Sequence, residues 1–267
     1  DTWIKNMPSN NEKGYYLGDG IYIGSATGET KFPHNILITG VCLENNTRNQ
    51  MSITGARQVR VTGCTLLNGR NSGIDLEPNS LNGDVEDISI VGNTFDQTKN
   101  GVDVTKAAHA VVVSGNTIRC PINPAPGTCG VRMGPAAFDV TVCGNSIYGA
   151  QAGVKMNGRN AVVTGNRIYS STRGLWVEGW GHVVTGNLVE GAVEVGLMVD
   201  AEGANVSNNT LYNCVTKDSP DNKFRASLFV KTHLNGILSG NLIRDDRPNP
   251  PPMTPIVLPT DAQFTST

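Results

Sequence analysis

One short pattern recurs along most of the chain and limits its fold more than any other feature. Each copy holds an apolar run, a small residue, a Gly-Asn turn or a variant of it, and a second apolar run. The copies are ILITGVCL (36–43), VRVTGCTL (59–66), ISIVGNTF (88–95), VVVSGNTI (111–118), VTVCGNSI (140–147), AVVTGNRI (161–168), HVVTGNLV (182–189), ANVSNNTL (204–211) and GILSGNLI (236–243). Nine copies in one chain indicate a repeat architecture rather than an ordinary globular domain.

A second pattern lies between the copies of the first. It reads GIYIG (20–24), MSIT (51–54), GIDLE (73–77), GVDVT (101–105), GVRMG (130–134), GVKMN (153–157), GLWVE (174–178), GLMVD (196–200) and SLFVK (227–231). Each repeat therefore holds three short strands and three turns over a step of just over twenty residues, with longer steps where loops are inserted. Such a step without a helix is typical of one coil of a parallel β-solenoid.

We therefore predict an all-β chain of about nine coils, each with three short strands. The solenoid should span residues 1–243, with its first coil near 15–43. Residues 244–267 are rich in proline, which lacks the N–H group that a sheet needs, so we expect a tail or cap that cannot continue the sheet.

The Asn of the Gly-Asn turn should form an internal ladder. Seven copies place it at Asn93, Asn116, Asn145, Asn166, Asn187, Asn209 and Asn241. Stacked coils would let each side-chain amide donate to the next one and help to satisfy the buried turn. Because Val41 and Cys64 occupy this place in the first two copies, we expect the ladder to begin at the third coil. Gly-Asn turns also occur in antiparallel hairpins, but a fixed period argues against that alternative.

This order of strand, Gly-Asn turn, strand, variable loop and GI-x-I-x strand resembles the right-handed parallel β-helix of the pectate-lyase-like superfamily. The resemblance covers residues 15–243, and the strings GDGIYIG (18–24) and GIDLEPN (73–79) are most similar to phage tailspikes and bacterial polysaccharide depolymerases. It implies a polysaccharide or oligosaccharide ligand, and a location outside the cell or on a virion surface. A homotrimer would fit the tailspike resemblance.

The GI-x-I-x strands should form two columns of outward side chains, because their apolar residues face the core. The first column is Tyr22, Ser52, Asp75, Asp103, Arg132, Lys155, Trp176, Met198 and Phe229. The second column is Gly24, Thr54, Glu77, Thr105, Gly134, Asn157, Glu178, Asp200 and Lys231. Neighbours in a column lie about 4.8 Å apart at the backbone. Asp75 and Asp103 should therefore be adjacent, with Glu77 beside them.

These three acids are our candidate catalytic residues. Two close carboxylates repel, which raises the pKa of one of them and keeps it protonated as a general acid while the other acts as base or nucleophile. Glycoside hydrolysis needs that pair, with about 5–5.5 Å between carboxyls for retention and about 6.5–9.5 Å for inversion. Asp75 with Asp103 and Asp75 with Glu77 bracket both cases, so the stereochemistry stays open.

A lyase is the alternative enzyme. Asp75, Glu77 and Asp103 would then hold Ca²⁺, which prefers six to eight oxygen ligands, and the hydrolase alternative needs no cofactor. Arg132 or Lys155 would abstract the proton next to a uronate carboxylate, which resembles the calcium-dependent pectate lyases.

The saccharide-binding residues follow from the same columns. In the families that the chain resembles, this face is the saccharide-binding groove. Arg132, Lys155 and Glu178 would contact an acidic sugar, and Tyr22 and Trp176 would stack on sugar rings.

The strip also has a non-catalytic explanation. Outward positions of a solenoid are polar in any case, and Asp103 beside Arg132 would make a plain cross-strand ion pair. The protein would then be a carbohydrate-binding or structural solenoid, such as part of a fibre. We expect Trp176, Met198 and Phe229 to be exposed, which favours an interaction site because clustered exposed apolar groups usually mark one.

Charge and composition exclude other classes of protein. A formal net charge of -2 leaves no basic excess for neutralising phosphates, so we expect no nucleic-acid partner. No apolar run is long enough to cross a membrane, and no signal peptide is visible. The six cysteines lack the CxxC spacing of zinc sites. Cys120 and Cys129 bracket a loop, and whether they form a disulfide or remain thiols is open.

Overall fold

Short strands form at every apolar run of the repeat, because apolar and β-branched side chains alternate there with polar ones. The computed structural model describes residues 2–5, 18–24, 32–79, 85–121, 124–216, 226–231, 235–251 and 254–259. Throughout these ranges the regular structure is β-strand, and no helix occurs.

The strands fall into three rows. The front row contains β2 (Ile21–Ile23), β5 (Met51–Ile53), β8 (Ser72–Leu76), β11 (Asn100–Val104), β14 (Cys129–Met133), β17 (Ala152–Arg159), β20 (Arg173–Trp180), β23 (Val195–Glu202), β26 (Ala226–Val230) and β29 (Thr254–Val257). The side row contains β3 (His34–Thr39), β6 (Ala56–Thr62), β9 (Val85–Val91), β12 (His109–Ser114), β15 (Phe138–Cys143), β18 (Val162–Thr164), β21 (Val183–Thr185), β24 (Asn205–Ser207) and β27 (Ile237–Ser239). The back sheet contains β1 (Thr2–Lys5), β4 (Val41–Glu44), β7 (Thr65–Leu67), β10 (Thr94–Asp96), β13 (Thr117–Arg119), β16 (Ser146–Tyr148), β19 (Arg167–Tyr169), β22 (Leu188–Glu190), β25 (Thr210–Tyr212) and β28 (Leu242–Arg244).

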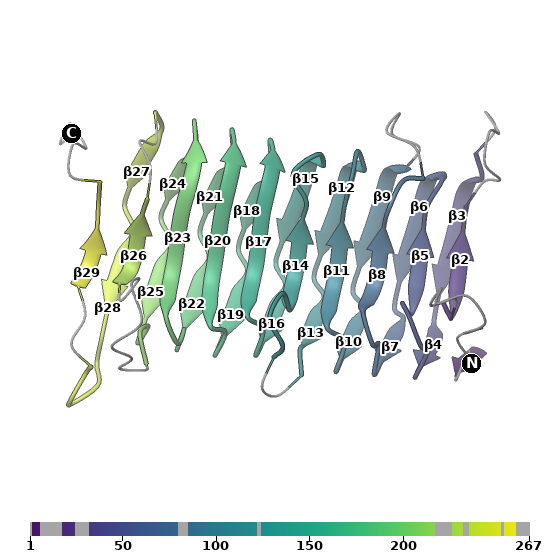
Figure 1. Cartoon of the computed structure of the whole chain (residues 1–267), viewed down its shortest axis with the longest axis horizontal. Helices are drawn as coiled ribbons and strands as arrows, with labels where there is room; N and C mark the ends of the chain where they lie inside the picture. Colours follow the sequence, from purple (N-terminus) through teal and green to yellow (C-terminus); the bar gives the residue numbers. More distant parts are fainter. Residues whose placement is uncertain are drawn as a thin grey trace.

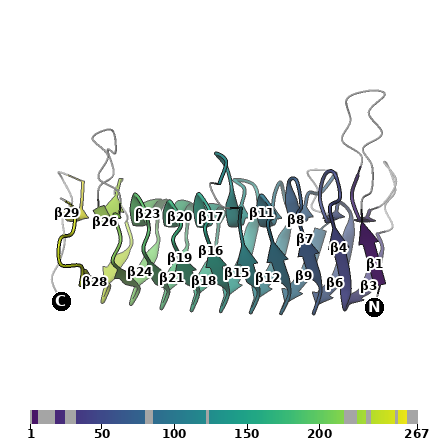
Figure 2. The same ribbon diagram turned by 90° about the horizontal axis from the view of Figure 1, so that it is seen from below.

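One strand from each row makes a coil, and strands of successive coils pair in parallel. The described residues contain nine such triplets, from β2–β3–β4 to β26–β27–β28. Figures 1 and 2 show the coils stacked in sequence order along the long axis of the molecule. The predicted β-solenoid of about nine coils with three short strands each is confirmed.

The interior is a continuous apolar column. Each row contributes its inward positions, and on the back sheet these include Phe95, Ile118 and Ile147, which are fully buried on adjacent coils. No single coil could bury these side chains, so the stability of each coil depends on its neighbours.

The Asn ladder is present as predicted. Asn145 shows its geometry: both its backbone N–H and its side-chain amide donate to the side-chain oxygen of Asn166, at 3.0 and 2.9 Å. The same amide also donates to the carbonyl oxygen of Val113 at 2.9 Å. At the start of the ladder the Cys64 N–H donates to Asn93 at 2.9 Å, so the first rung belongs to the third coil. The ladder replaces hydration for the polar groups of each buried turn.

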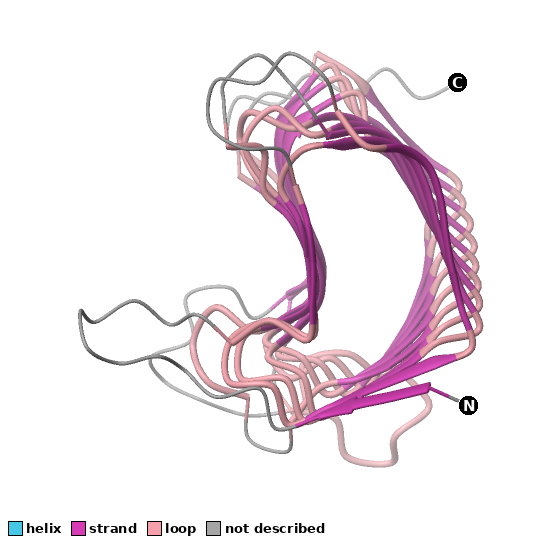
Figure 3. Cartoon of the chain, turned by 90° about the vertical axis from the view of Figure 1, so that its right-hand side faces the viewer, coloured by secondary structure: helices cyan, strands magenta, loops and turns pink. Residues whose placement is uncertain are grey.

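The front row is concave toward the outside of the molecule. Viewed along the long axis, it curves inward, and loops project along both of its edges (Figure 3). These loops include 45–50, 68–71 and 97–99 on the side where the front strands begin. We call this concave outer face of the front row the groove, and it holds a pocket lined by Arg48, Asp75, Asp103 and Arg132 among others.

The proline-rich tail departs from our expectation that it cannot continue the sheet. Thr254–Val257 form β29, which pairs in parallel with β26. Pro255 is tolerated because β29 lies at the edge of the row, where one side of the strand needs no partner.

Candidate active site in the groove

The predicted column of groove residues is in register along its whole length. Each member pairs with the next one on the neighbouring coil: Tyr22 with Ser52, Ser52 with Asp75, Asp75 with Asp103, Asp103 with Arg132, Arg132 with Lys155, Lys155 with Trp176, Trp176 with Met198, and Met198 with Phe229. The acids are therefore adjacent, as the period of the sequence predicted.

The column is more buried than we predicted. Asp75 is 9% exposed and Asp103 is 4% exposed, because the front row is concave and loops flank it. The expected exposed series of Trp176, Met198 and Phe229 is wrong: Met198 is buried and the other two are half-buried. Buried charges, and not exposed apolar groups, therefore distinguish this face of the protein.

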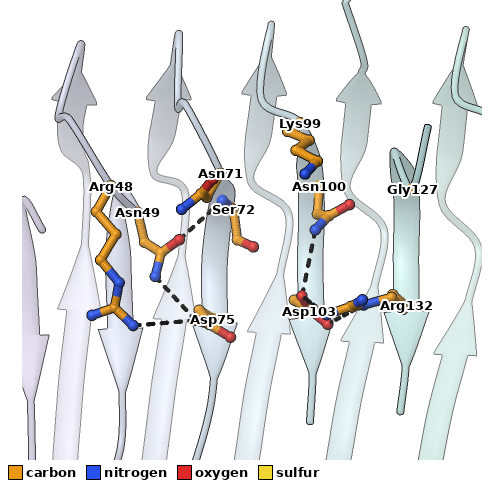
Figure 4. A pocket seen from close by; sticks show the side chains of 10 residues that line it. All are labelled: Arg48, Asn49, Asn71, Ser72, Asp75, Lys99, Asn100, Asp103, Gly127 and Arg132. Atoms are coloured by element: carbon orange, nitrogen blue, oxygen red, sulfur yellow. Dashed lines mark hydrogen bonds and ion pairs between the residues drawn. The ribbon is translucent and has the colours of Figure 1, made fainter. Parts of the chain in front are cut away.

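Asp75 lies in a pocket of about 280 Å³ at the base of the groove (Figure 4). Its Oδ2 accepts a hydrogen bond from Asn49 at 3.0 Å and lies 4.0 Å from the guanidinium of Arg48. Burial, followed by the negative charges of Asp103 and Glu77, raises the pKa of Asp75 from 3.8 to about 7. A substantial fraction of this carboxyl is therefore protonated at neutral pH. The pocket is lined by Arg48, Asn49, Asn71, Ser72, Asp75, Lys99, Asn100, Asp103, Gly127 and Arg132.

Asp103 is held differently. Arg132 donates to both carboxylate oxygens, from Nε at 2.7 Å and from a terminal nitrogen at 2.5 Å. Asn100 approaches the same carboxylate at 3.4 Å. Burial raises the pKa of Asp103, but the hydrogen bonds and charge of Arg132 oppose that effect. Since the guanidinium stays charged, it keeps Asp103 the more acidic member of the pair with Asp75.

Glu77 stands at the edge of this pair. Its two carboxylate oxygens contact Arg48 at 3.3 Å and Lys106 at 3.2 Å. It lies two residues beyond Asp75, on the same face of the chain. Glu77 is thus ion-paired and more open to solvent than either aspartate.

The sequence interpretation missed the residues that surround the two aspartates. Asn49 and Asn100 occupy equivalent places, three residues before Ser52 and Asp103. The side-chain amide of Asn49 donates to Ser52, and that of Asn100 donates to Asp103. The side-chain oxygen of each Asn accepts a backbone N–H of the next coil: Asn49 from Ser72, and Asn100 from Cys129. The recurrence of Asn at this offset was the available signal.

Four of the predicted saccharide-binding residues lie away from the pocket. Tyr22 is 55% exposed, and its hydroxyl accepts a hydrogen bond from Thr54 at 2.7 Å. The Lys155 ammonium lies 3.6 Å from the centre of the Trp176 ring and 3.4 Å from Glu178. Arg173 also lies over the Trp176 ring, at 4.3 Å. The Trp176 ring therefore faces cations, and its predicted role in sugar stacking stays a prediction.

The acids do not suit a calcium site. Asp103 is bonded to Arg132, and Glu77 to Arg48 and Lys106. Ca²⁺ would have to displace these cations to collect its oxygen ligands. Over the ranges that the structure describes, no three His, Cys, Asp or Glu side chains are grouped as metal ligands.

Cys120 and Cys129 are free thiols in the structure. Both are buried, which raises the pKa of Cys120 to about 12 and that of Cys129 to about 11. Neither is therefore a thiolate nucleophile at neutral pH, although Cys129 begins the strand that carries Arg132.

Comparisons with known proteins agree with the fold. The family described as right handed beta helix region matches residues 8–122. The structure is similar to the periplasmic alginate epimerase AlgG, with a TM-score of 0.66 at 15% identity over 96% of this chain and 59% of the epimerase. It is similar to an alginate lyase from Paenibacillus sp. str. FPU-7, with a TM-score of 0.59 at 14% identity over 91% of this chain and 78% of the lyase.

A third similar structure is a tailspike protein of the E. coli bacteriophage HK620 in complex with a pentasaccharide. The TM-score is 0.57 at 16% identity, over 84% of this chain and 46% of the tailspike. The chain thus spans about half the length of the tailspike and of the epimerase. Curated protein sequences give no match.

Within the described residues, no helix has the length and apolar character needed to cross a membrane. The family match and the structural likeness together confirm the fold that the sequence resemblance implied: the chain is a right-handed parallel β-helix.

Proposed function

We propose that this protein cleaves glycosidic bonds of an acidic polysaccharide by acid/base hydrolysis in the groove of the front row. Support comes from the fold, which the chain shares with an alginate lyase, an alginate epimerase and a tailspike that binds a pentasaccharide. The roles of the individual residues rest on the chemistry of the pocket. We also propose that the protein acts outside the cell or on a virion surface, and a homotrimer stays a prediction.

The observation that carries the proposal is the unequal environment of Asp75 and Asp103. Two neighbouring carboxyls whose surroundings separate their pKa values are suited to act as an acid and a base. Asp75, with its pKa raised to about 7, would protonate the leaving-group oxygen. Asp103, paired with Arg132, would be the carboxylate that serves as nucleophile or activates water.

The spacing of the acids connects the reaction to its stereochemistry. The backbones of Asp75 and Asp103 are one strand spacing apart, about 4.8 Å, so parallel side chains would bring the two carboxyls to about the separation found in retaining enzymes. Glu77 lies about 6.6 Å from Asp75 along the strand, at the lower end of the inverting range. A first product with retained anomeric configuration would identify Asp103 as the second carboxylate, and an inverted one would identify Glu77.

The cations of the pocket favour an acidic substrate. Arg48, Lys99 and Arg132 all line the cavity that holds the two aspartates. Such groups bind carboxylates of uronate sugars through charge-assisted hydrogen bonds. An acidic chain would also replace part of the Asp103 contact with Arg132, which would free that carboxylate for chemistry.

The test is a screen of acidic and neutral polysaccharides with the wild-type chain, Asp75→Asn and the matched control Asp96→Asn. Asp96 lies half-buried on the outward face of the back sheet, away from the pocket, so its variant controls for the same chemical change. We expect new reducing ends from wild type and from Asp96→Asn, with a loss of at least a hundredfold in Asp75→Asn. Equal digestion by Asp75→Asn and wild type would refute the assignment of the acid.

The same screen separates the alternatives. A lyase generates unsaturated products that absorb ultraviolet light, and a calcium-dependent one is inactivated by a chelator. The geometry gives the lyase less support, because Arg132 is bound to Asp103 and Lys155 to Glu178, so neither is placed as a free base. A binding protein would retain the polymer without releasing product.

A further inference from the structure

A second concave site lies at the rim of the groove. A cavity of about 500 Å³ is lined by Pro135, Ala136, Gly158, Arg159 and Trp180. Trp180 is 55% exposed, an unusual state for a side chain with so much apolar surface. The cavity shares no lining residue with the pocket of Asp75, and no part of the proposed hydrolysis uses it.

The rim cavity belongs to the same strands as the groove floor. Arg159 and Trp180 pair across β17 and β20, four residues beyond Lys155 and Trp176. Four residues of strand span about 13 Å, and Arg159 also pairs with Phe138 of β15, so the cavity lies where the front row meets the side row. Since β17 is two coils beyond the Asp103 strand, Arg159 also lies about 10 Å along the axis from the pocket.

Arg159 is held in place without a carboxylate partner. Its guanidinium lies 4.7 Å from the centre of the Phe138 ring, which in turn stacks on His109 at 4.5 Å. No acidic side chain within the described ranges forms an ion pair with it. By contrast, Arg57 pairs with Glu86 on the same edge. Arg159 thus presents an oriented, unneutralised guanidinium beside an exposed indole.

The remaining walls of the cavity are small. Gly158 adds no side chain to them, because a Cβ there would collide with the carbonyl oxygen of Ala137 and with Cε of the buried Met133. Pro135 and Ala136 are exposed and complete the lining. An aromatic face, small apolar walls and a planar cation together match a sugar ring that carries a carboxylate.

We propose that the cavity between Arg159 and Trp180 binds a uronate unit of the polysaccharide, as a second subsite outside the catalytic pocket. The sugar ring packs on the Trp180 indole, and its carboxylate accepts hydrogen bonds from Arg159. This inference rests on the proposed function for its choice of ligand, but it is a statement about binding and not about cleavage.

The test uses the full chain with Asp75→Asn, which prevents turnover, and measures binding by calorimetry. The probes are a short oligogalacturonate and its carboxyl-reduced neutral counterpart. Adding Trp180→Ala should weaken binding of both probes about tenfold. Adding Arg159→Gln should weaken the binding of the acidic probe alone, and should make that binding less dependent on salt concentration. Tyr148→Ala, which truncates an exposed aromatic residue on the back sheet, should change neither.

Unchanged affinity in both Trp180→Ala and Arg159→Gln would overturn the subsite, as would equal weakening by Tyr148→Ala. Absence of any binding of the acidic probe by the Asp75→Asn chain would overturn it too. These outcomes are distinguishable from failure of the proposed hydrolysis. If wild type cleaves a polymer and the rim variants bind the probes with unchanged affinity, only the proposed subsite is refuted. Binding that depends on the rim, without cleavage of any polymer, removes only the hydrolase.

Discussion

Removing one rung from the middle of the Asn ladder should destabilise the protein far more than removing the last rung. In Asn166→Ala the buried N–H of Asn145 loses its acceptor and the carbonyl oxygen of Val142 loses a donor. Each buried polar group left without a partner costs about 1–3 kcal/mol, so the loss should total about 4 kcal/mol. Asn166 is completely buried, so bulk solvent does not reach the groups that it leaves.

Asn241→Ala is the matched control. Asn241 accepts from Asn209 and donates to the carbonyl oxygen of Val206, but it is half-buried at the end of the ladder. Water can reach the groups that it leaves, so the loss should be about 1 kcal/mol, the net value of an ordinary hydrogen bond. Urea unfolding followed by circular dichroism measures both changes, provided the slope with denaturant is unchanged. Equal losses in the two variants would refute the ladder as a source of stability.

Further predictions concern packing and pH. Gly158→Ala should lower the melting temperature by several degrees, because the added Cβ would collide with the carbonyl oxygen of Ala137. Gly134→Ala is the control and should be tolerated, because the nearest atom to its Cβ would be 3.5 Å away. Equal melting temperatures of the two variants would contradict the packing of loop 134–137. His182 accepts the Ala161 N–H at 3.0 Å through Nδ1, and Nε2 donates to the Glu178 carbonyl at 2.8 Å. Burial lowers the pKa of His182 below 6.5, so the unfolded chain binds its proton more readily and stability should fall as the pH drops below 6.5. Unfolding of wild type and His182→Gln at pH 7.5 and 5 tests this, and an identical pH dependence in the two proteins would argue against it.

The period of the sequence was sufficient to place residues that are far apart in the chain. Asp75, Asp103 and Arg132 fall at the same position of successive repeats, and stacking at a fixed step makes them neighbours whatever the loops between them do. The Asn ladder was predictable for the same reason. Register follows from the repeat because one inward position in each strand must remain inward.

Burial of the groove was not predictable in that way. It depends on the curvature of the front row and on loops whose lengths differ between coils, and neither is periodic. Asn49 and Asn100 were overlooked because they precede the segments MSIT and GVDVT from which the columns were predicted, outside the alternating pattern. Arg159 and Trp180 were overlooked because β17 and β20 run past the end of the repeat pattern.

The protonation of Asp75 at neutral pH is the claim on which the account depends most. Carboxyl carbon resonances of Asp-labelled protein, recorded from pH 3 to 9 and assigned by comparison with Asp75→Asn, measure it directly. The structure predicts a midpoint of about 7 for Asp75. A midpoint near the ordinary value of 3.8 would mean that the groove holds two carboxylates and no acid.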